Sequence, residues 1–246
     1  MERPARLPFV ISVPHVGNRV PPEVDGLTEL TRDAIIADGD EGAAEIFLPL
    51  RDLVSRLVTT EIARTFVDVN RPADDLHGVT QPHTRRGEAV YRRSPDARVR
   101  ATLLERYHGP YHRALVEGAA VAQLGLDCHT TAARGCLDGS IWPLVCLGDA
   151  GGRSCPPSTV TRLAACLEQT FGAKVVINEP FSAGHITRSR PGGIPWIQIT
   201  LSGEPWTTPH VKSRLLATAL LLLHHGTPGI VEYGSGGEQL VRQDRI

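Results

Sequence analysis

The sequence predicts a single α/β domain, built on a mostly parallel, mixed sheet with helices on both faces. Short apolar runs of strand length alternate along the chain with longer stretches of helical periodicity, which is the pattern of strand–helix–strand units. The chain has 246 residues, a length that suits one large α/β domain. Since no Pro- and Gly-rich linker divides it, we expect residues 1–246 to form one domain, with a tail at 226–246 whose packing the sequence leaves open.

Strands are expected where short apolar or alternating runs end at turn-forming residues. The first such run is rich in β-branched residues and is closed by Pro14, which cannot continue a central strand. The expected strands cover residues 7–13, 57–62, 65–69, 123–127, 142–147, 174–177 and 194–201.

Helices are expected where apolar residues recur every three or four positions. Thr28 is a suitable N-cap for the first helix, and the residues from Asp38 to Gly42 interrupt the pattern before a second, short one. Residues 72–98 are polar, rich in Arg and Pro and without periodicity, which predicts a long functional loop. The expected helices cover residues 28–37, the stretch leading to Phe47, and residues 99–121, 157–171 and 211–225.

Composition narrows the class of protein. The formal net charge is −1 and the pI is about 6.8, so we expect no nucleic-acid partner, which would need a basic stripe. The most apolar segment, residues 215–223, is too short to span a bilayer, and we expect no membrane partner. The five cysteines are irregularly spaced without a Cys-x-x-Cys pair, which argues against a disulfide framework or a thiolate zinc site and favours a cytoplasmic protein. The oligomeric state stays open.

Two histidines stand at the ends of expected strands, His15 after residues 7–13 and His129 after residues 123–127. Ligands of open α/β sheets gather at the carboxyl ends of strands. A lone histidine beside an apolar run is usually structural, but the acidic stretch between these two adds Asp40. Two imidazoles and a carboxylate are ligands that catalytic zinc uses, with a fourth position left for water. The sequence therefore predicts a divalent-metal site.

Asp127 precedes His129 by two positions, so both side chains should point to the same side of a strand. Asp127 would then orient the imidazole of His129 from behind, or it would serve only as a hydrogen-bonded strand end.

A second group of polar residues follows the expected strand at 65–69. Arg71 stands before a proline and is held extended, a posture that can aim its guanidinium into a cleft. Asp68 and Asn70 share a face if the strand continues, and the alternative is a turn rich in Asp and Asn. The arginines between residues 85 and 100 form either a solvated face or a clamp for a carboxylate. Residues 178–187 form either a substrate-binding loop or a plain connection.

Several short motifs occur in the order seen in the N-formylglutamate amidohydrolase family, and the chain resembles that family over residues 8–201. The resemblance implies an α/β sandwich fold related to zinc carboxypeptidases. It also implies hydrolysis of N-formylglutamate to formate and glutamate, the last step of one histidine-degradation route. The motifs are Pro14-His15-Val16-Gly17, Asp40-Glu41-Gly42, Val67-Asp68-Val69-Asn70-Arg71-Pro72, Pro110-Tyr111-His112, Asp127-Cys128-His129-Thr130, Leu147-Gly148 and Asn178-x-Pro180-Phe181-x-x-Gly184-His185-Ile186-Thr187.

The same resemblance implies roles for individual residues. The ligands of a zinc ion, or of another divalent metal, would be His15, Asp40 and His129, with Asp127 and Asp68 orienting them. A substrate carboxylate or carbonyl oxygen would meet Arg71, with Asn70 beside it. The substrate pocket would be lined by Asn178, Gly184 and His185, with His112 nearby, and both Arg71 and His185 would take part in catalysis.

One position departs from the family pattern. The family usually shows Gln-x-Glu on the late strand, with the Glu as general base, whereas this chain has Thr200 two residues after Gln198. Threonine cannot accept a proton near neutral pH, and loss of a general base typically costs about 10²–10⁴-fold in rate. Glu204 is the expected substitute, and Glu179 or Glu232 are alternatives.

These observations predict a metal-dependent amidohydrolase acting on a small carboxylate-bearing amide such as N-formylglutamate. Two alternatives stay open. The chain can hydrolyse a different substrate, such as a peptide or a modified amino acid, or it can bind a ligand without hydrolysing it.

Overall fold

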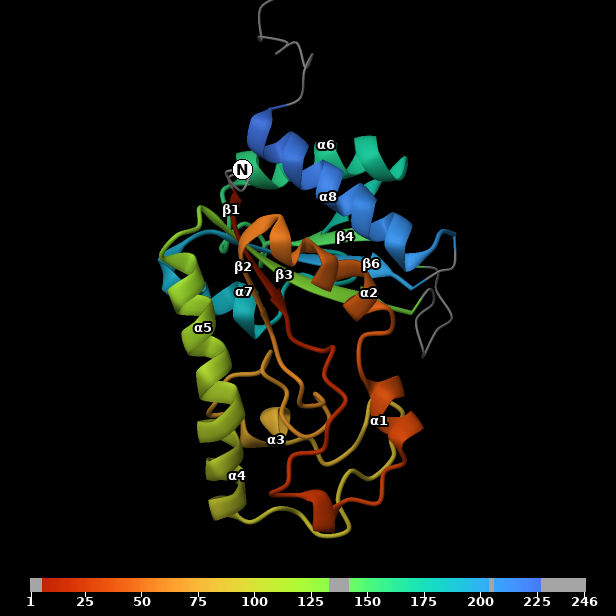
Figure 1. Cartoon of the computed structure of the whole chain (residues 1–246), viewed down its shortest axis with the longest axis vertical. Coiled ribbons are helices and arrows are strands. Elements are labelled where there is room, and N and C mark those ends of the chain that lie inside the picture. The colour runs from red at the N-terminus through yellow and green to blue at the C-terminus, as the bar shows by residue number, and fades with distance from the viewer. Residues whose placement is uncertain (1–5, 133–141, 204–205, 227–246) are drawn as a thin grey trace, which may run out of the picture.

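A computed structural model of the chain describes residues 6–132, 142–203 and 206–226. They form a six-stranded sheet with the strand order β2-β1-β3-β6-β4-β5 (Figure 1). The strands are β1 (Leu7–Val13), β2 (Val54–Thr59), β3 (Leu124–Thr131), β4 (Val145–Gly148), β5 (Val175–Ile177) and β6 (Trp196–Ser202).

The sheet is mostly parallel, as predicted. β2, β1, β3 and β6 all run in one direction, while β4 is antiparallel to β6 and β5 is parallel to β4. The carboxyl ends of β4 and β5 therefore point opposite to those of the other four strands. The segment after β5 nevertheless reaches the same site, since residues 180–185 line the pocket described below.

Helices cover both faces of the sheet, as predicted (Figure 1). On one face, alternate strand residues such as Leu126 and Ile199 pack against α2 (Ala43–Phe47), α6 (Pro157–Phe171) and α8 (Pro209–His225). On the other face, Val10 and Trp196 belong to a second core that includes residues of α5 (Gly109–Ala119) and α7 (His185–Ser189). The remaining α-helices are α1 (Arg32–Asp38), α3 (Leu76–Val79) and α4 (Ala97–Leu103).

The strand predicted over residues 65–69 is wrong. These residues form turns and irregular backbone, because local hydrogen bonds replace those of a sheet. The Phe66 N–H donates to the carbonyl of Ala63, and the Thr65 hydroxyl donates to the buried Asp38 carboxylate. The strand predicted over 57–62 is displaced: β2 starts at Val54, because Leu7 N–H donates to the Leu53 carbonyl and so brings β2 into register with β1 earlier.

Several other boundaries differ from those predicted. The helix expected over 99–121 is divided by a π-helical turn, Leu104–His108, between α4 and α5. α1 starts at Arg32 and is capped by Thr31, whose hydroxyl accepts from Ala34 N–H. β3 runs four residues beyond its predicted end, so that His129 lies within the strand. α7 was not predicted, whereas the prediction of α6 is confirmed.

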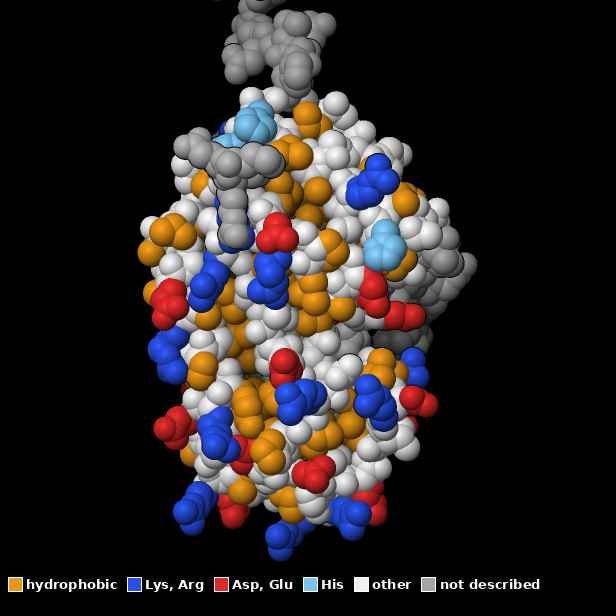
Figure 2. Space-filling model, in the orientation of Figure 1, with side chains coloured by type: hydrophobic (Ala, Val, Ile, Leu, Met, Phe, Trp, Pro, Cys, Tyr) orange, Lys and Arg blue, Asp and Glu red, His pale blue; other side chains and the backbone are white. Residues whose placement is uncertain are grey.

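The predicted loop at 72–98 is irregular apart from α3 and the start of α4 at Ala97. Arg92 pairs with Glu29 at the surface, and Arg85 lines the pocket described below. Basic and acidic side chains are interspersed over the face shown in Figure 2. Within the described residues, no helix combines the length and the apolar character that crossing a membrane requires.

Candidate metal centre and substrate pocket

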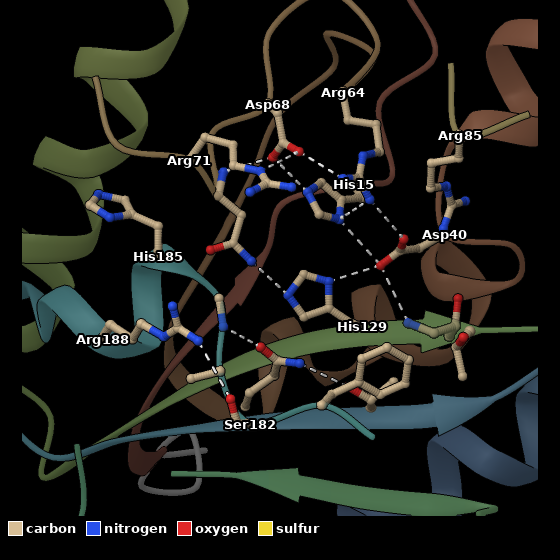
Figure 3. Close-up of a pocket in the computed structure, with 18 of the residues that line it drawn as sticks. His15, Asp40, Arg64, Asp68, Arg71, Arg85, His129, Ser182, His185 and Arg188 are labelled. Carbon is tan, nitrogen blue, oxygen red and sulfur yellow. Dashed lines mark hydrogen bonds and ion pairs between the residues drawn. The ribbon is translucent and has the colours of Figure 1, made fainter. Parts of the chain in front are cut away.

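Three buried side chains converge at the carboxyl ends of the parallel strands (Figure 3). His15 follows β1, Asp40 precedes α2, and His129 lies near the end of β3. One ligand atom from each lies within 4.8 Å of the others. The Nδ1 atoms of His15 and His129 lie 3.4 and 2.9 Å from the same oxygen, Asp40 Oδ2. Among the described residues this is the one group of three such side chains with a spacing suited to a metal ion.

The other nitrogen of each imidazole contacts a second carboxylate. His15 Nε2 lies 2.9 Å from Asp68 Oδ1, and His129 Nε2 lies 3.3 Å from Asp127 Oδ2. Metal-binding histidines commonly hold a carboxylate in this way, which fixes the ring and its tautomer. The prediction that Asp127 points to the same side as His129 is confirmed by this contact.

Arg64 also contacts His15. Its Nη1 atom lies 3.2 Å from His15 Nδ1, the nitrogen that faces Asp40 Oδ2, while the guanidinium Nη2 donates to Asp68 Oδ2 at 2.7 Å. Two imidazoles and a carboxylate are a donor set that fits zinc and several other divalent ions. Sequence reasoning missed Arg64, because only the folded turn brings it to the site.

Several ionisable groups of the site have pKa values far from their usual range. Burial raises the pKa of the Asp40 carboxyl, but the charges and hydrogen bonds of His15 and His129 outweigh this and hold that pKa well below its usual range. Arg64 and His15 likewise keep the pKa of the buried Asp68 carboxyl well below its usual range. Burial lowers the pKa of His129, while Asp127 and Asp40 together raise it to about 10. Both lining carboxylates are therefore ionised at neutral pH.

Asn70 connects the site to its surroundings from a turn rather than from a strand. Asp68 Oδ1 accepts from Asn70 N–H at 2.9 Å, which is the Asx-turn alternative. The Asn70 side chain donates from Nδ2 to Asp127 Oδ2 at 3.2 Å and accepts at Oδ1 from Ile186 N–H at 2.9 Å. A Cβ atom on Gly184 would collide with this amide, so glycine is required there.

The pocket in front of the site has a volume of about 620 Å³. Its wall combines cationic and uncharged polar groups, with Asp40 and Asp68 as the carboxylates among the described lining residues. Arg188, which sequence reasoning missed, projects toward Ser182, with Nη2 3.4 Å from its hydroxyl (Figure 3). The cationic lining residues are Arg64, Arg71, Arg85 and Arg188, and the uncharged polar ones include Asn70, Thr130, Thr131, Ser182, Gln198 and Thr200.

The structure brings some of the predicted substrate residues to this pocket and not others. Arg71, Gly184 and His185 line it, although the His185 ring points away from the metal ligands, toward α5 (Figure 3). Asn178 is not among the lining residues. Its side chain instead donates to Asp149 Oδ1 at 2.7 Å, although residues 180–185 of the same segment line the pocket.

The remaining predicted residues are more distant. His112 does not line the pocket, and its Nε2 donates to the carbonyl of Val69 at 2.9 Å. Glu179 is exposed and also lies outside the lining set. Glu204 and Glu232, the other proposed bases, lie outside the described residues.

Comparison with known proteins gives consistent matches. The model of the N-formylglutamate amidohydrolase family matches residues 7–204. Two curated relatives, the N-formylglutamate deformylases of Pseudomonas aeruginosa and Pseudomonas putida, are each 32% identical over 201 residues, which cover 74% of this chain and 74% of each relative.

Solved structures match the fold at lower identity. The N-formylglutamate amidohydrolase of Ralstonia eutropha JMP134 has a TM-score of 0.70 at 18% identity, covering 89% of this chain and 92% of that one. A gene product of Agrobacterium tumefaciens has a TM-score of 0.71 at 16% identity, covering 89% of this chain and 90% of that one. These likenesses concern the arrangement of strands and helices only.

Proposed function

The chain belongs to the N-formylglutamate amidohydrolase family, and on that premise we propose that it is a metal-dependent enzyme that hydrolyses N-formylglutamate to formate and glutamate. The observation that carries the metal dependence is the convergence of His15, Asp40 and His129 at the base of an arginine-lined pocket. Zinc is the proposed ion, since two imidazoles and a carboxylate leave one position open for water.

When bound, such an ion polarises the formyl carbonyl and lowers the pKa of water toward neutrality. Asp68 and Asp127 would hold the two imidazoles in the orientation that presents their Nδ1 atoms to Asp40. The ionised state of Asp40 and Asp68 is compatible with a dication nearby.

The arginines suit the proposed substrate. N-formylglutamate carries two carboxylates, and a planar guanidinium matches a carboxylate with two parallel hydrogen bonds. Arg71 and Arg85 are about half exposed and Arg188 is exposed, so each retains donors that can face a ligand. Arg64 is instead buried against Asp68 and Asp40 and would serve to hold the site together.

Proton transfer is the weakest point of this pocket. Asp40 and Asp68 cannot accept a proton at neutral pH, because their pKa values lie far below their usual range. Thr200 has no proton-accepting group near neutral pH, and its hydroxyl accepts from Gln198 Nε2 at 3.1 Å. We propose Glu204 as the acceptor, so Glu204→Gln should lower kcat by about 10²-fold or more.

The threonine at position 200 also favours a second candidate function. A protein that keeps the pocket and lacks the base would bind an amino-acid-like anion without hydrolysing it, or would act on an amide that is hydrolysed without a general base.

We also propose a cytoplasmic location for the protein. Its chemical support is that Cys128, Cys146, Cys155 and Cys166 are buried free thiols.

The deciding experiment measures metal content of the purified chain, then formate released from N-formylglutamate. One divalent ion per chain together with formate release supports the proposed enzyme. Metal with tight glutamate binding and no formate supports the binding protein. A chain that takes up no divalent ion, even after dialysis against zinc, contradicts the metal dependence.

A further inference from the structure

We propose that His108 and His112 are positioning residues that hold the Val69–Arg71 turn, and through it the Asn70 side chain, against the candidate metal centre. Their effect on turnover rests on the proposed function, whereas their effect on the turn does not. Neither histidine touches the three metal-ligand candidates, so the proposal concerns how the site is held in place.

The carbonyl groups of this turn need hydrogen-bond donors, because residues 69–71 are not part of the sheet. Buried carbonyl groups require hydrogen-bond donors, and a strand would supply them from its neighbours. Here the Val69 carbonyl accepts from His112 Nε2 at 2.9 Å, and the Arg71 carbonyl accepts from His108 Nε2 at 2.8 Å. Since carbonyls only accept, both Nε2 atoms carry hydrogen. Two imidazoles thus take the place of a neighbouring strand.

The imidazole rings of His108 and His112 lie side by side on one face of the same helix. His108 ends the π-helical turn and His112 lies four residues later in α5, so both side chains share one face of the helix. The rings stack with centroids 4.4 Å apart and planes 27° from parallel. A single π-helical turn inside a helix often marks a functional position, and here it delivers the ring that meets Arg71.

Asn70 lies between the two held carbonyls and transmits their position. Its side chain donates to Asp127 Oδ2, the oxygen that also lies 3.3 Å from His129 Nε2. Its Oδ1 accepts from Ile186 N–H in α7, and its backbone carbonyl accepts from His185 N–H at 3.4 Å. A shift of the turn would therefore displace both the contacts around the candidate ligand His129 and the start of α7.

The donor on His112 is uncharged at neutral pH. Burial, and then the neighbouring His108, lower the pKa of His112 to about 4. An uncharged N–H donor of similar reach should therefore replace the imidazole. Glutamine offers one, because its side-chain amide nitrogen sits at a comparable distance from the backbone, whereas asparagine is too short and leucine has no donor.

The test uses the full-length chain with His112→Gln, His112→Asn, His112→Leu and His108→Leu, and with His210→Gln on the exposed first turn of α8 as control. Amide hydrogen exchange at Ile186 reports the position of Asn70 and needs neither metal nor turnover. Exchange in α6, packed on the other face of the sheet, reports global unfolding. Formate release then gives kcat/KM.

We expect exchange at Ile186 to be about 10-fold faster or more in the His112→Asn, His112→Leu and His108→Leu variants, with α6 unchanged. His112→Gln should stay within about threefold of the parent. Where formate is released, kcat/KM should fall about 10–100-fold in the first three variants and be largely kept in His112→Gln, as for other residues that support a metal ligand.

Two outcomes would overturn the proposal. One is parental exchange at Ile186 in both leucine variants. The other is equal acceleration in His112→Gln and His112→Asn, since the donor would then not be the property that matters. This second comparison decides the question even if the leucine variants unfold. A parent that releases no formate yet shows the expected exchange pattern would refute the proposed function alone.

Discussion

His129 and Thr200 are direct neighbours in the sheet, because β3 and β6 pair in parallel with these two residues opposite each other. Both side chains line the pocket. A carboxylate at position 200 would therefore stand beside a candidate metal ligand, where an attacking water must lose its proton. Among the described lining residues the carboxylates are Asp40 and Asp68, and both are engaged in ion pairs.

Thr200→Glu should raise kcat for formate release from N-formylglutamate. The added carboxylate restores a proton acceptor, an effect typically worth about 10²–10⁴-fold, and we expect a gain of about 10-fold or more because another group already serves in part. Thr200→Gln is the matched control, since it has the same size and no basic group. Equal kcat values for the two variants would show that position 200 does not limit proton transfer.

Metal binding should depend on His129. The parent is expected to hold one divalent ion per chain after dialysis against zinc, and His129→Ala to bind it at least about 100-fold more weakly. Zinc at about 100 times its Kd should raise the unfolding free energy of the parent by about 2.7 kcal/mol, measured by urea denaturation with and without chelator. His210→Ala, on the exposed start of α8, should behave as the parent. Full metal retention in His129→Ala would rule out this ligand.

Arg188→Gln should raise KM for N-formylglutamate by about 10-fold or more and leave kcat within about twofold. A hydrogen bond to a charged group contributes about 1.5–3 kcal/mol, and this guanidinium contacts Ser182 at the pocket wall without reaching the metal ligands. The same variant should no longer distinguish N-formylglutamate from N-formylglutamine. Arg98→Gln, exposed on α4, is the control. An unchanged KM would remove Arg188 from the substrate site.

Gly184→Ala should damage the site by displacing Asn70. The new methyl group would collide with the Asn70 amide, and overpacking of this kind costs about 1–3 kcal/mol of unfolding free energy. Formate release should fall at the same time, because Asn70 contacts Asp127. Gly26→Ala is a suitable control, since a Cβ atom there meets nothing within 4 Å. Equal urea midpoints and activities for the two variants would contradict the close packing.

His112 should make stability depend on pH. Its pKa is about 4 in the folded chain against an ordinary value of 6.5, so between these values the unfolded chain binds more protons. The contribution is complete above pH 6.5 and is lost as the pH falls toward 4. From pH 7 to 4.5 the parent should lose on the order of 2 kcal/mol more unfolding free energy than His112→Gln, measured by urea denaturation. Parallel pH profiles would show that the pKa of His112 is the same in the folded and the unfolded chain.

The sequence was sufficient for the class of fold and for the choice of metal-ligand candidates. The periodicity of the expected strands predicts both the fold class and the two histidines, because His15 follows an apolar run and Asp127 and His129 alternate along another. The resemblance to the N-formylglutamate amidohydrolase family is confirmed by the family match. The individual roles of these residues stay predictions.

Other features depend on tertiary contacts that local pattern does not encode. The apolar run containing Phe66 and Val69 resembles a strand, yet it packs as a turn in the second core beneath α5. The sequence places Asn178 in the pocket because it follows a strand, but its side chain is held by Asp149, a contact between residues distant in sequence. Arg64 and Arg188 carry no local signal, because many surface arginines have the same surroundings in sequence.

In the sheet β1 lies between β2 and β3, yet the three candidate ligands become available at different times during synthesis of the chain. A ribosome completes β1, Asp40 and β2 early, while β3 with His129 is synthesised only after residue 123. A nascent chain that ends before β3 therefore holds two of the three ligand candidates and cannot close the site. Any cation that requires all three can be captured only after His129 has been synthesised.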